Sequence, residues 1–350
     1  MFRRFSLFFP IAVAIGLTLG TGTASAQLDS VLLRGQPVAK KGVLKEITKD
    51  KLTLEINGVA QSFDVNQIVR FNFDEEPNEL NNARNAIAVR KYQLAAEELK
   101  KLDGKPEKNR DIAADIAFYK AYCQAKLALT AGGDRAAAIT KLLDWAKSHA
   151  NNFHFYESAE LLGDLSVAAG QSADAARYYG SLSTAPWPDY QMKGNIAVGR
   201  ALLAEKKFPE ALEKFDAVAA ASENSADAEA QKRLAVAGKA VCLAETGKAD
   251  EGIALLNAII KDNNPEEDKV LFARTYTALG NCYLKQNKNK EALQAFLFTD
   301  ILFDVDADAH AEALYHLSKL WADVNKTERA TQAKATLKDR YAGSVWAGMN

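Results

Sequence analysis

The sequence has few of the residues and none of the short motifs that define most catalytic sites. It contains only three cysteines among 350 residues, an odd number that excludes a disulfide framework. It lacks a Gly-x-Ser-x-Gly nucleophile turn, a phosphate-binding loop, a dinucleotide fingerprint and a Cys-x-x-Cys pair. We therefore expect no catalytic residues, no cofactor and no metal, so the chain is predicted not to be an enzyme.

An excess of charge of one sign is also absent. The chain carries 44 basic and 45 acidic residues, interspersed along its length. Removing the first 26 residues takes away two arginines and no acid, which leaves a charge of −3 with neutral histidines. A balanced surface without a basic run gives no electrostatic support for binding nucleic acid or an anionic membrane. We expect protein partners and no nucleic acid.

Long apolar runs are missing except at the amino terminus. Two arginines, an apolar run over residues 5–19 and the small-x-small site Ala24-Ser25-Ala26 follow one another, as in a secretory signal peptide. The run is shorter than the roughly 20 residues of a membrane-spanning helix. Residues 1–26 are therefore predicted to be cleaved, so that the mature chain starts at Gln27, is periplasmic or secreted, and keeps no integral membrane segment. An uncleaved anchor and twin-arginine transport are the less favoured alternatives.

Residues 27–76 are predicted to form a small β unit. Leu52, Leu54 and Ile56 alternate with polar residues, and Asn57-Gly58 is a strong signal for a two-residue hairpin turn. Phe63 and Val65 continue the alternation on the return strand, and further strands are expected at 30–34, 42–48 and 67–73. The strand sequences weakly resemble SH3-like or Sm-like barrels. So short a unit makes a marginal core, so we expect it to lean on the first helices as a cap or docking module. Sm-like barrels bind RNA, but export and balanced charge disfavour that role here.

From residue 77 to residue 350 the apolar residues follow helical spacing, and one interval recurs. A small residue is followed twelve positions later by another small residue, and in most copies a large apolar residue comes four positions after that. Six copies start at Ala83, Gly163, Gly199, Ala240, Gly280 and Ser318. A distorted copy spans 111–150, with Ala121 as its small residue, so we predict about seven helix pairs. Left-handed turns within pairs are expected at Gly170, Gly247, Asn287 and Asn325.

This pattern resembles the tetratricopeptide repeat (TPR), in which two antiparallel helices cross at small residues and successive pairs stack into a solenoid. The fold class implied is mainly α, a TPR-like α-solenoid preceded by a small β barrel-like unit. The carboxy-terminal stretch from Ala313 to Ala347 resembles the closing repeat of exported bacterial TPR proteins, such as the periplasmic protein of the Tol-Pal system and outer-membrane assembly factors. The resemblance suggests a cell-envelope compartment without naming a partner.

The remaining reactive or polar residues are interpreted as structural. Cys123, Cys242 and Cys282 are expected to be buried free thiols, because equivalent helices of a stack lie about 8–10 Å apart, too far for a disulfide. His149 and His154 are interpreted as surface residues of a connection. Asp304, Asp306 and Asp308 are expected to cap a helix rather than bind calcium. Glu157, Glu160 and Asp164 are expected to form a solvated helix face rather than a paired-acid site.

The binding surface is predicted from the family resemblance. In TPR proteins the first helix of each pair lines a concave groove, which here offers a set of polar and aromatic contacts: Lys193, Arg200, Arg274, Asn281, Tyr315 and Lys319. Only Asn281 matches the family's carboxylate clamp, so a clamp is not expected. The sequence thus predicts a non-catalytic envelope scaffold that binds a partner segment. The alternatives are an accessory subunit that binds glycan or peptidoglycan, and an enzyme with an unrecognised site.

Overall fold

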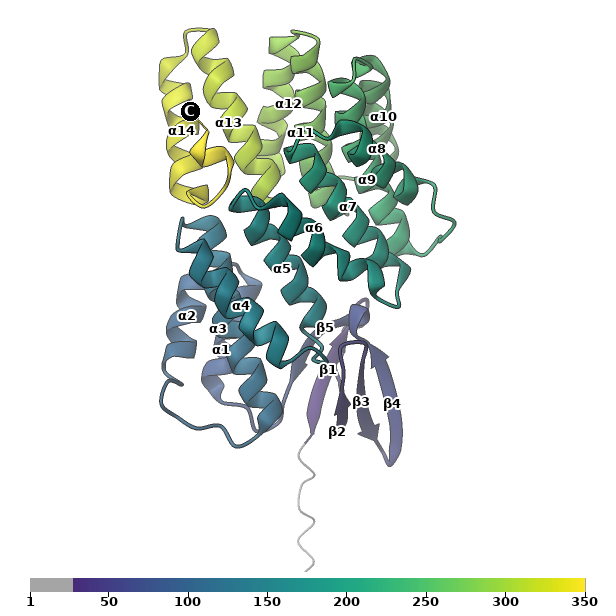
Figure 1. Ribbon diagram of the computed structural model, residues 1–350, viewed down its shortest axis with the longest axis vertical. Coiled ribbons are helices and arrows are strands. Elements are labelled where there is room, and N and C mark those ends of the chain that lie inside the picture. The colour runs from purple at the N-terminus through teal and green to yellow at the C-terminus, as the bar shows by residue number, and fades with distance from the viewer. Residues whose placement is uncertain (1–27, 350) are drawn as a thin grey trace, which may run out of the picture.

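The computed structural model describes residues 28–349, so the predicted signal peptide lies outside the described residues. A small sheet at one end is followed by a stack of helices that curves through the rest of the molecule (Figure 1). The last strand ends at Asn72 and the first helix begins at Asn78. The sequence breaks between them at Asp74-Glu75-Glu76-Pro77, where proline cannot continue a strand ladder and the acids precede a helix.

The sheet is a five-stranded antiparallel meander whose last strand returns to the first. Its order is β4-β3-β2-β1-β5. Asn57 and Gly58 both have positive φ, as a type I′ hairpin turn requires, which confirms the predicted hairpin. Val65 lies just beyond β4 in a short 3₁₀ turn rather than on the return strand as predicted. The strands are β1 Asp29–Leu33, β2 Lys40–Ile47, β3 Lys51–Ile56, β4 Val59–Asp64 and β5 Ile68–Asn72.

Fourteen α-helices follow within the described residues, which confirms the predicted solenoid of about seven pairs. Consecutive helices pack as antiparallel pairs, and each pair stacks on the next (Figure 1). The pairs are α1 Asn78–Ala88 with α2 Tyr92–Lys100, α3 Arg110–Thr130 with α4 Arg135–Ser148, α5 Phe155–Ala168 with α6 Ser172–Gly180, α7 Pro188–Ala204 with α8 Phe208–Ala219, α9 Ala226–Glu245 with α10 Ala249–Asp262, α11 Lys269–Lys285 with α12 Asn289–Leu302, and α13 Ala307–Asp323 with α14 Thr327–Tyr341.

Each pair turns through one residue in the left-handed region. The four predicted turn residues have φ between 57° and 87°. Gly132 supplies the turn of the distorted second pair, and its φ is 73°. In the first and fourth pairs the position is taken by Arg90 and Lys206, with φ of 59° and 60°. A side chain with a Cβ is strained there, so these two turns carry a conformational cost that glycine avoids.

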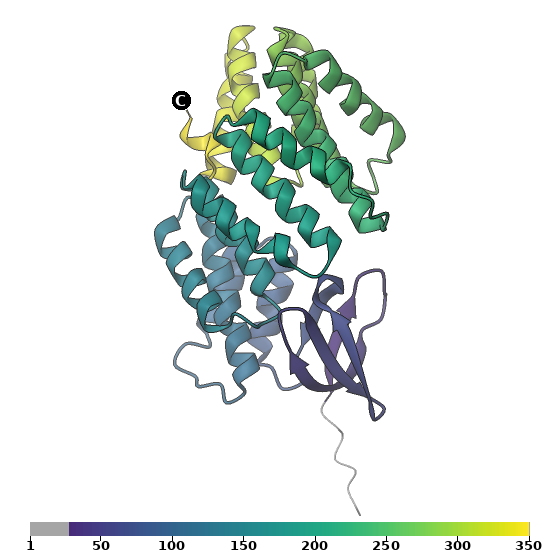
Figure 2. The ribbon, with the colours of Figure 1, turned by 45° about the vertical axis from the view of Figure 1, so that its right-hand side comes forward.

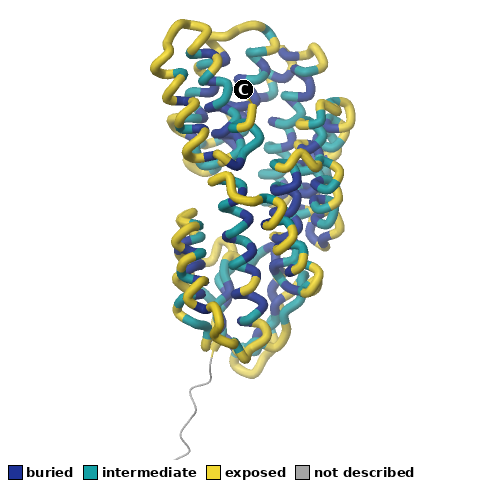
Figure 3. Tube along the Cα trace, turned by 60° about the vertical axis from the view of Figure 1, so that its left-hand side comes forward, coloured by how far each residue is buried: buried dark blue, intermediate teal, exposed yellow. Residues whose placement is uncertain are grey.

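The recurring interval has a direct cause in the packing within pairs. A Cβ added at Gly163, Gly199 or Gly280 would lie 2.3, 2.9 or 2.6 Å from an aromatic ring of the partner helix. Those rings are Tyr179, Phe215 and Phe296, the large residues that end each copy of the pattern. The first helix therefore needs glycine because the ring of the second helix rests on its backbone. Figure 3 shows the buried residues following these seams, while exposed residues follow the turns.

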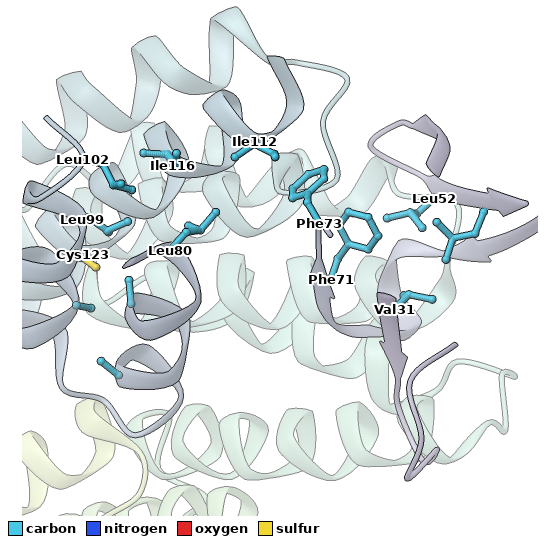
Figure 4. Packing of buried hydrophobic residues seen from close by; sticks show 14 of the residues in the cluster. Val31, Leu52, Phe71, Phe73, Leu80, Leu99, Leu102, Ile112, Ile116 and Cys123 are labelled. Atoms are coloured by element: carbon cyan, nitrogen blue, oxygen red, sulfur yellow. The ribbon is translucent and has the colours of Figure 1, made fainter. Parts of the chain in front are cut away.

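The sheet and the first helices share one hydrophobic core. Val31, Leu52 and Phe71 of the strands are at most 3 % exposed and belong to the same cluster as Leu80 and Leu99 of α1 and α2 (Figure 4). Ile112 and Ile116 extend this cluster onto α3. The sheet thus packs on the first helices, as expected of a unit too small to bury its own apolar face.

The sheet unit also reaches pairs much further along the chain. The Asn66 side chain donates to Asp189 at the start of α7 at 3.0 Å, and the Tyr156 hydroxyl of α5 donates to Asp50 at 2.9 Å. Arg34 forms an ion pair of 2.6 Å with Asp227 at the start of α9. The unit therefore lies against the ends of α5, α7 and α9, at the lower end of the solenoid in Figure 2.

Candidate functional site

The six predicted contact residues lie on the first helices of three pairs, α7, α11 and α13. Their side chains are occupied by neighbouring helices rather than free. Lys193 of α7 forms an ion pair of 2.6 Å with Glu160 of α5. The partnership raises the pKa of Lys193 against the lowering effect of burial, and it holds the pKa of Glu160 below its ordinary value although burial alone would raise it.

Arg200 and Arg274 converge on the beginning of α13. Asp308 accepts from Arg200 of α7 at 2.5 Å and from Arg274 of α11 at 2.9 Å. Arg274 also contacts Asp306 at 2.7 Å. Burial would raise the pKa of Asp308, but the two guanidinium groups hold it well below its ordinary value. Because α7 and α13 are three pairs apart along the solenoid, their contact shows that this face is concave.

Asn281 and Glu312 form the next contact along the same face. The Asn281 side chain amide donates to Glu312 at 2.7 Å. Burial raises the pKa of Glu312 to about 7, the hydrogen bond from Asn281 opposes this rise, and the charge of Asp308 adds to it. Glu312 is therefore a carboxylate without a cation of its own, which titrates near neutral pH.

Tyr315 and Lys319 continue this line along α13. The Lys319 ammonium lies 5.5 Å from the centre of the Tyr315 ring, within range of a cation–π contact. Tyr315 also lies 5.5 Å from the Trp346 ring, in the segment that follows α14. Trp145 and Trp187 are buried, with 5 % and 8 % exposed, whereas Trp321 is half-buried and has the Arg329 guanidinium 4.7 Å from its ring centre. The described residues therefore present no row of exposed tryptophans of the kind a glycan site would use.

The acidic residues of α5 are exposed or half-buried, in keeping with the solvated face predicted for them, and each also has a partner. Asp164 accepts from the Tyr179 hydroxyl at 2.7 Å, and Glu157 accepts from His154 at 3.0 Å. Burial and the nearby charge of Glu160 raise the pKa of Asp164. We call the concave face the inner surface, defined by Glu157, Glu160, Asp164, Lys193, Arg200, Arg274, Asn281, Asp308, Glu312, Tyr315 and Lys319.

The inner surface combines both signs of charge and is closed by its own contacts. Two hollows of residues 28–349 lie elsewhere. A hollow of about 490 Å³ lies between the start of α2 and the end of α3, beside Tyr92 and Leu127. Another of about 560 Å³ lies between Ile47 and the start of α3. In this conformation Lys193, Arg200, Arg274 and Asn281 are held by acidic side chains of neighbouring helices, namely Glu160, Asp308 and Glu312.

The surface assignment of His154 was wrong. His154 is 4 % exposed and stacks on Phe118 with ring centres 3.7 Å apart. Its Nε2 lies 2.8 Å from Asp115 and its Nδ1 lies 3.0 Å from Glu157. A carboxylate at each ring nitrogen favours the protonated, doubly donating form of the ring. These hydrogen bonds raise the pKa of His154, although burial alone would lower it.

The buried network continues from Asp115 toward the sheet. Arg84 of α1 donates to Asp115 and forms an ion pair of 2.6 Å with Glu76. Arg84 and Asp115 are 5 % and 1 % exposed. Buried charges are tolerated when they are paired and hydrogen-bonded, as here. Sequence reasoning missed this chain of residues because its members come from four segments, and only the helical phase of Arg84 and Asp115, on the buried faces of their helices, signalled it.

Two other histidines, His310 and His316, lie on α13. His310 is fully buried, with its ring nitrogens 2.7 Å from the Tyr341 hydroxyl and from Asp300. His316 stacks on Phe296, and burial lowers its pKa to about 4. The predicted cap is confirmed for Asp306, whose carboxylate accepts from the Ala309 backbone at the start of α13.

The cysteines and the candidates for metal binding fit a structural role. Cys123, Cys242 and Cys282 are free and buried, as predicted, and burial raises the pKa of each thiol to about 12. Within residues 28–349 no three histidine, cysteine or acidic side chains are placed to hold a metal ion. Across the same residues, every helix is too short or too polar to cross a membrane.

Comparison with known proteins shows similarity in structure alone. No protein-family model matches the sequence, and no curated protein sequence matches it. A tetratricopeptide repeat protein from Parabacteroides merdae ATCC 43184 is similar with a TM-score of 0.50 and 17 % identity, over 75 % of this chain and 92 % of that one. The Rap conjugation gene regulator of plasmid pLS20, solved with the Phr* peptide, has a TM-score of 0.50 and 14 % identity, over 74 % and 73 % of the two chains. The helical part of this chain thus has the fold of tetratricopeptide repeat proteins.

Proposed function

We propose that the protein is a non-catalytic, exported scaffold of the bacterial cell envelope that binds a segment of a protein partner on its inner surface. The observation that carries the proposal is the convergence of charged and amide side chains from α5, α7, α11 and α13 on one concave face. A protein of the same fold has been solved with a bound peptide. Concave faces of stacked helix pairs are suited to extended or helical segments.

Lys193, Tyr315 and Lys319 are the residues we assign to first contact with the partner. Lys193 is 38 % exposed although it is ion-paired, so it can exchange Glu160 for a carboxylate of the partner. Exposed ion pairs contribute about 0–1 kcal/mol, so such an exchange costs little. The Tyr315 ring with Lys319 beside it offers an apolar face and a cation, a combination suited to an acidic segment that carries an apolar side chain.

We further propose that residues 27–76 form an SH3/Sm-like barrel that caps the solenoid, and residues 77–350 its helical domain. The pairing of β1 with both β2 and β5 and the register shift in β2 between Leu44 and Glu46 support this, because a bent second strand can serve two sheets. Export rests on the signal sequence described above. N-terminal sequencing of protein from a periplasmic fraction should give Gln27, and an intact Met1 in the cytoplasmic fraction would refute export.

Binding can be tested with the mature chain and peptides selected from a random display library. Lys193→Ala and Lys319→Ala should each lower the affinity of the selected peptides at least about tenfold, which corresponds to 1.4 kcal/mol. Lys334→Ala is the matched control, because Lys334 is exposed on α14, a second helix, and should leave affinity unchanged. Peptides that bind all three variants equally well would refute binding at the inner surface.

A further inference from the structure

Two contacts join parts of the solenoid that are far apart in the sequence. In the first, Arg200 of α7 and Asp308 of α13 form an ion pair of 2.5 Å. In the second, the Arg135 guanidinium at the start of α4 donates to the Gly343 carbonyl after α14 at 2.6 Å. We call these four residues the clasp. It connects the last helix pair to the second and the fourth, while the chain between them follows the curve of the stack (Figure 1).

The ion pair of the clasp is accessible to water. The side chains of Arg200 and Asp308 are 41 % and 46 % exposed. Exposed ion pairs contribute little to stability and are screened by salt. Asp308 keeps a second arginine, Arg274 of the adjacent α11, at 2.9 Å. The contact across the inner surface can therefore break without leaving Asp308 unpaired.

The second contact depends on a glycine. A Cβ added at Gly343 would lie 2.2 Å from the Ala128 carbonyl oxygen and 2.4 Å from that of Leu129, both near the end of α3. Only a residue without a Cβ lets the corner after α14 approach the α3 backbone so closely. At the same corner, Ala342 lies against Gly132, whose added Cβ would be 3.2 Å from the Ala342 Cβ. The corner thus meets the end of α3 through small residues and backbone atoms.

We propose that the clasp is a built-in gate of the inner surface: the free chain exchanges between this closed form and an open form in which α13 and α14 leave α3 and α7, and a partner segment enters the open form. This inference rests on the proposed function, which identifies the entering molecule as a segment of a protein partner. It explains why Arg200 is paired with Asp308 across the inner surface in this closed form. A gate held by weak polar contacts opens readily, and a partner that binds the open form shifts the population toward it.

A pair of cysteines measures closure directly. Gly132→Cys and Ala342→Cys place two Cβ atoms 3.2 Å apart, slightly closer than the about 3.5–4.5 Å of a disulfide. The positive φ of Gly132 strains the cysteine there, but it does so equally in every variant compared. The three native cysteines are buried with raised pKa values and do not compete. In this background Gly343→Ala should slow diamide-induced cross-linking at least tenfold. Gly348→Ala is the control, because its Cβ would meet nothing within 4 Å. Equal rates for the two variants would overturn the clasp.

The ion pair is tested in the same background. Asp308→Asn should slow cross-linking. Added salt should slow cross-linking in the parent, which carries only the two introduced cysteines, and should have a smaller effect on Asp308→Asn. A parent rate that salt does not change would overturn the role of the ion pair. As a check without introduced cysteines, small-angle scattering of Gly343→Ala should give a larger radius of gyration than Gly348→Ala. The same radius for both would also count against opening.

The link between clasp and binding uses the peptides selected above. Oxidation of the cysteine pair should slow their association at least tenfold, and reduction should restore it. Unchanged association in the oxidised form would overturn the gate while leaving inner-surface binding intact. Peptides that bind the reduced form with an affinity unchanged by Lys193→Ala and Lys319→Ala would instead refute the proposed function. The cross-linking rates would in that case still decide whether the clasp opens.

Discussion

Replacing Gly280 by leucine should destabilise the sixth helix pair through a single identifiable collision. The first added atom, Cβ, would lie 2.6 Å from Cε1 and Cζ of the Phe296 ring, where ordinary carbon contacts are about 3.5–4.0 Å. The ring must therefore move by about 1 Å. It has little room, because Phe296 is fully buried and its other side stacks on His316 at 4.8 Å.

The size of the effect follows from two opposing terms. Overpacking a well-filled core costs about 1–3 kcal/mol when the neighbours have to shift. Leucine is a better helix former than glycine by about 0.8–1.0 kcal/mol, which offsets part of that cost for a small collision. The difference is about 0–2 kcal/mol, and because the rest of the leucine side chain must also fit beneath the ring, we expect a net loss in the upper half of this range, about 1–2 kcal/mol.

Urea denaturation followed by far-ultraviolet circular dichroism measures this loss, and hydrogen exchange of α11 and α12 locates it. Gly180→Leu is the matched control, since Gly180 ends α6 and an added Cβ there meets nothing within 4 Å. Phe296→Leu in the Gly280→Leu background should recover about 1 kcal/mol relative to additive effects, because the two sites are in contact. Equal losses for Gly180→Leu and Gly280→Leu, or additive effects at positions 280 and 296, would refute the reasoning.

Three further predictions concern backbone strain and pH. Lys206→Gly should raise the free energy of unfolding by about 0.5–1 kcal/mol, because the relief of left-handed strain exceeds the effect of the added entropy of the unfolded chain. Gly170→Ala should lower the free energy of unfolding, and calorimetry of both variants checks the two predictions. The pKa of His154 is raised in the folded state, so the protonated ring stabilises the fold below its unfolded pKa of about 6.5, and this stabilisation is lost as pH rises through its folded pKa. His154→Gln should abolish this fall in the free energy of unfolding with pH. The same dependence on pH in the variant and the parent would contradict the assignment. Glu312 titrates at about 7 when folded and near 4.5 when unfolded, so parent stability should fall as pH rises across this window. Glu312→Gln can keep the Asn281 hydrogen bond and should be more stable than the parent by about 1–3 kcal/mol at pH 8 and equal to it at pH 4, in matched urea titrations.

The helix pairs were predictable because their determinants are local. The interval from Gly280 to Phe296 lies within one pair, and Asn57-Gly58 specifies its hairpin by itself. The turns at Arg90 and Lys206 escaped prediction because a residue with a Cβ gives no signal of left-handed backbone. In the last pair Lys334 stands where the other copies of the pattern have their large residue, sixteen positions after the first small residue. Lys334 is exposed because no further pair in the described chain covers it.

The arrangement of the site could be predicted only in part. The helix phase placed Lys193 and Arg200 on the same face of α7, but their partners depend on how the stack curves. Arg200 meets Asp308 across 108 residues, a distance set by the small rotations between successive pairs. His154 was misassigned because a polar residue in a connection resembles a surface residue, and its partner Asp115 lies 39 residues earlier on the buried side of α3.

The contact between Gly343 and the end of α3 changes how mechanical and thermal stress should spread through the molecule. In an open stack of repeats each unit touches only its neighbours, so damage at one end decays along the array and stabilities add in one dimension. Here the array bends back until its ends touch, and the chain has the connectivity of a loop. Loss of the last pair would therefore be felt in the second pair as well as in the sixth, and unfolding should be more concerted than a linear array of the same length allows.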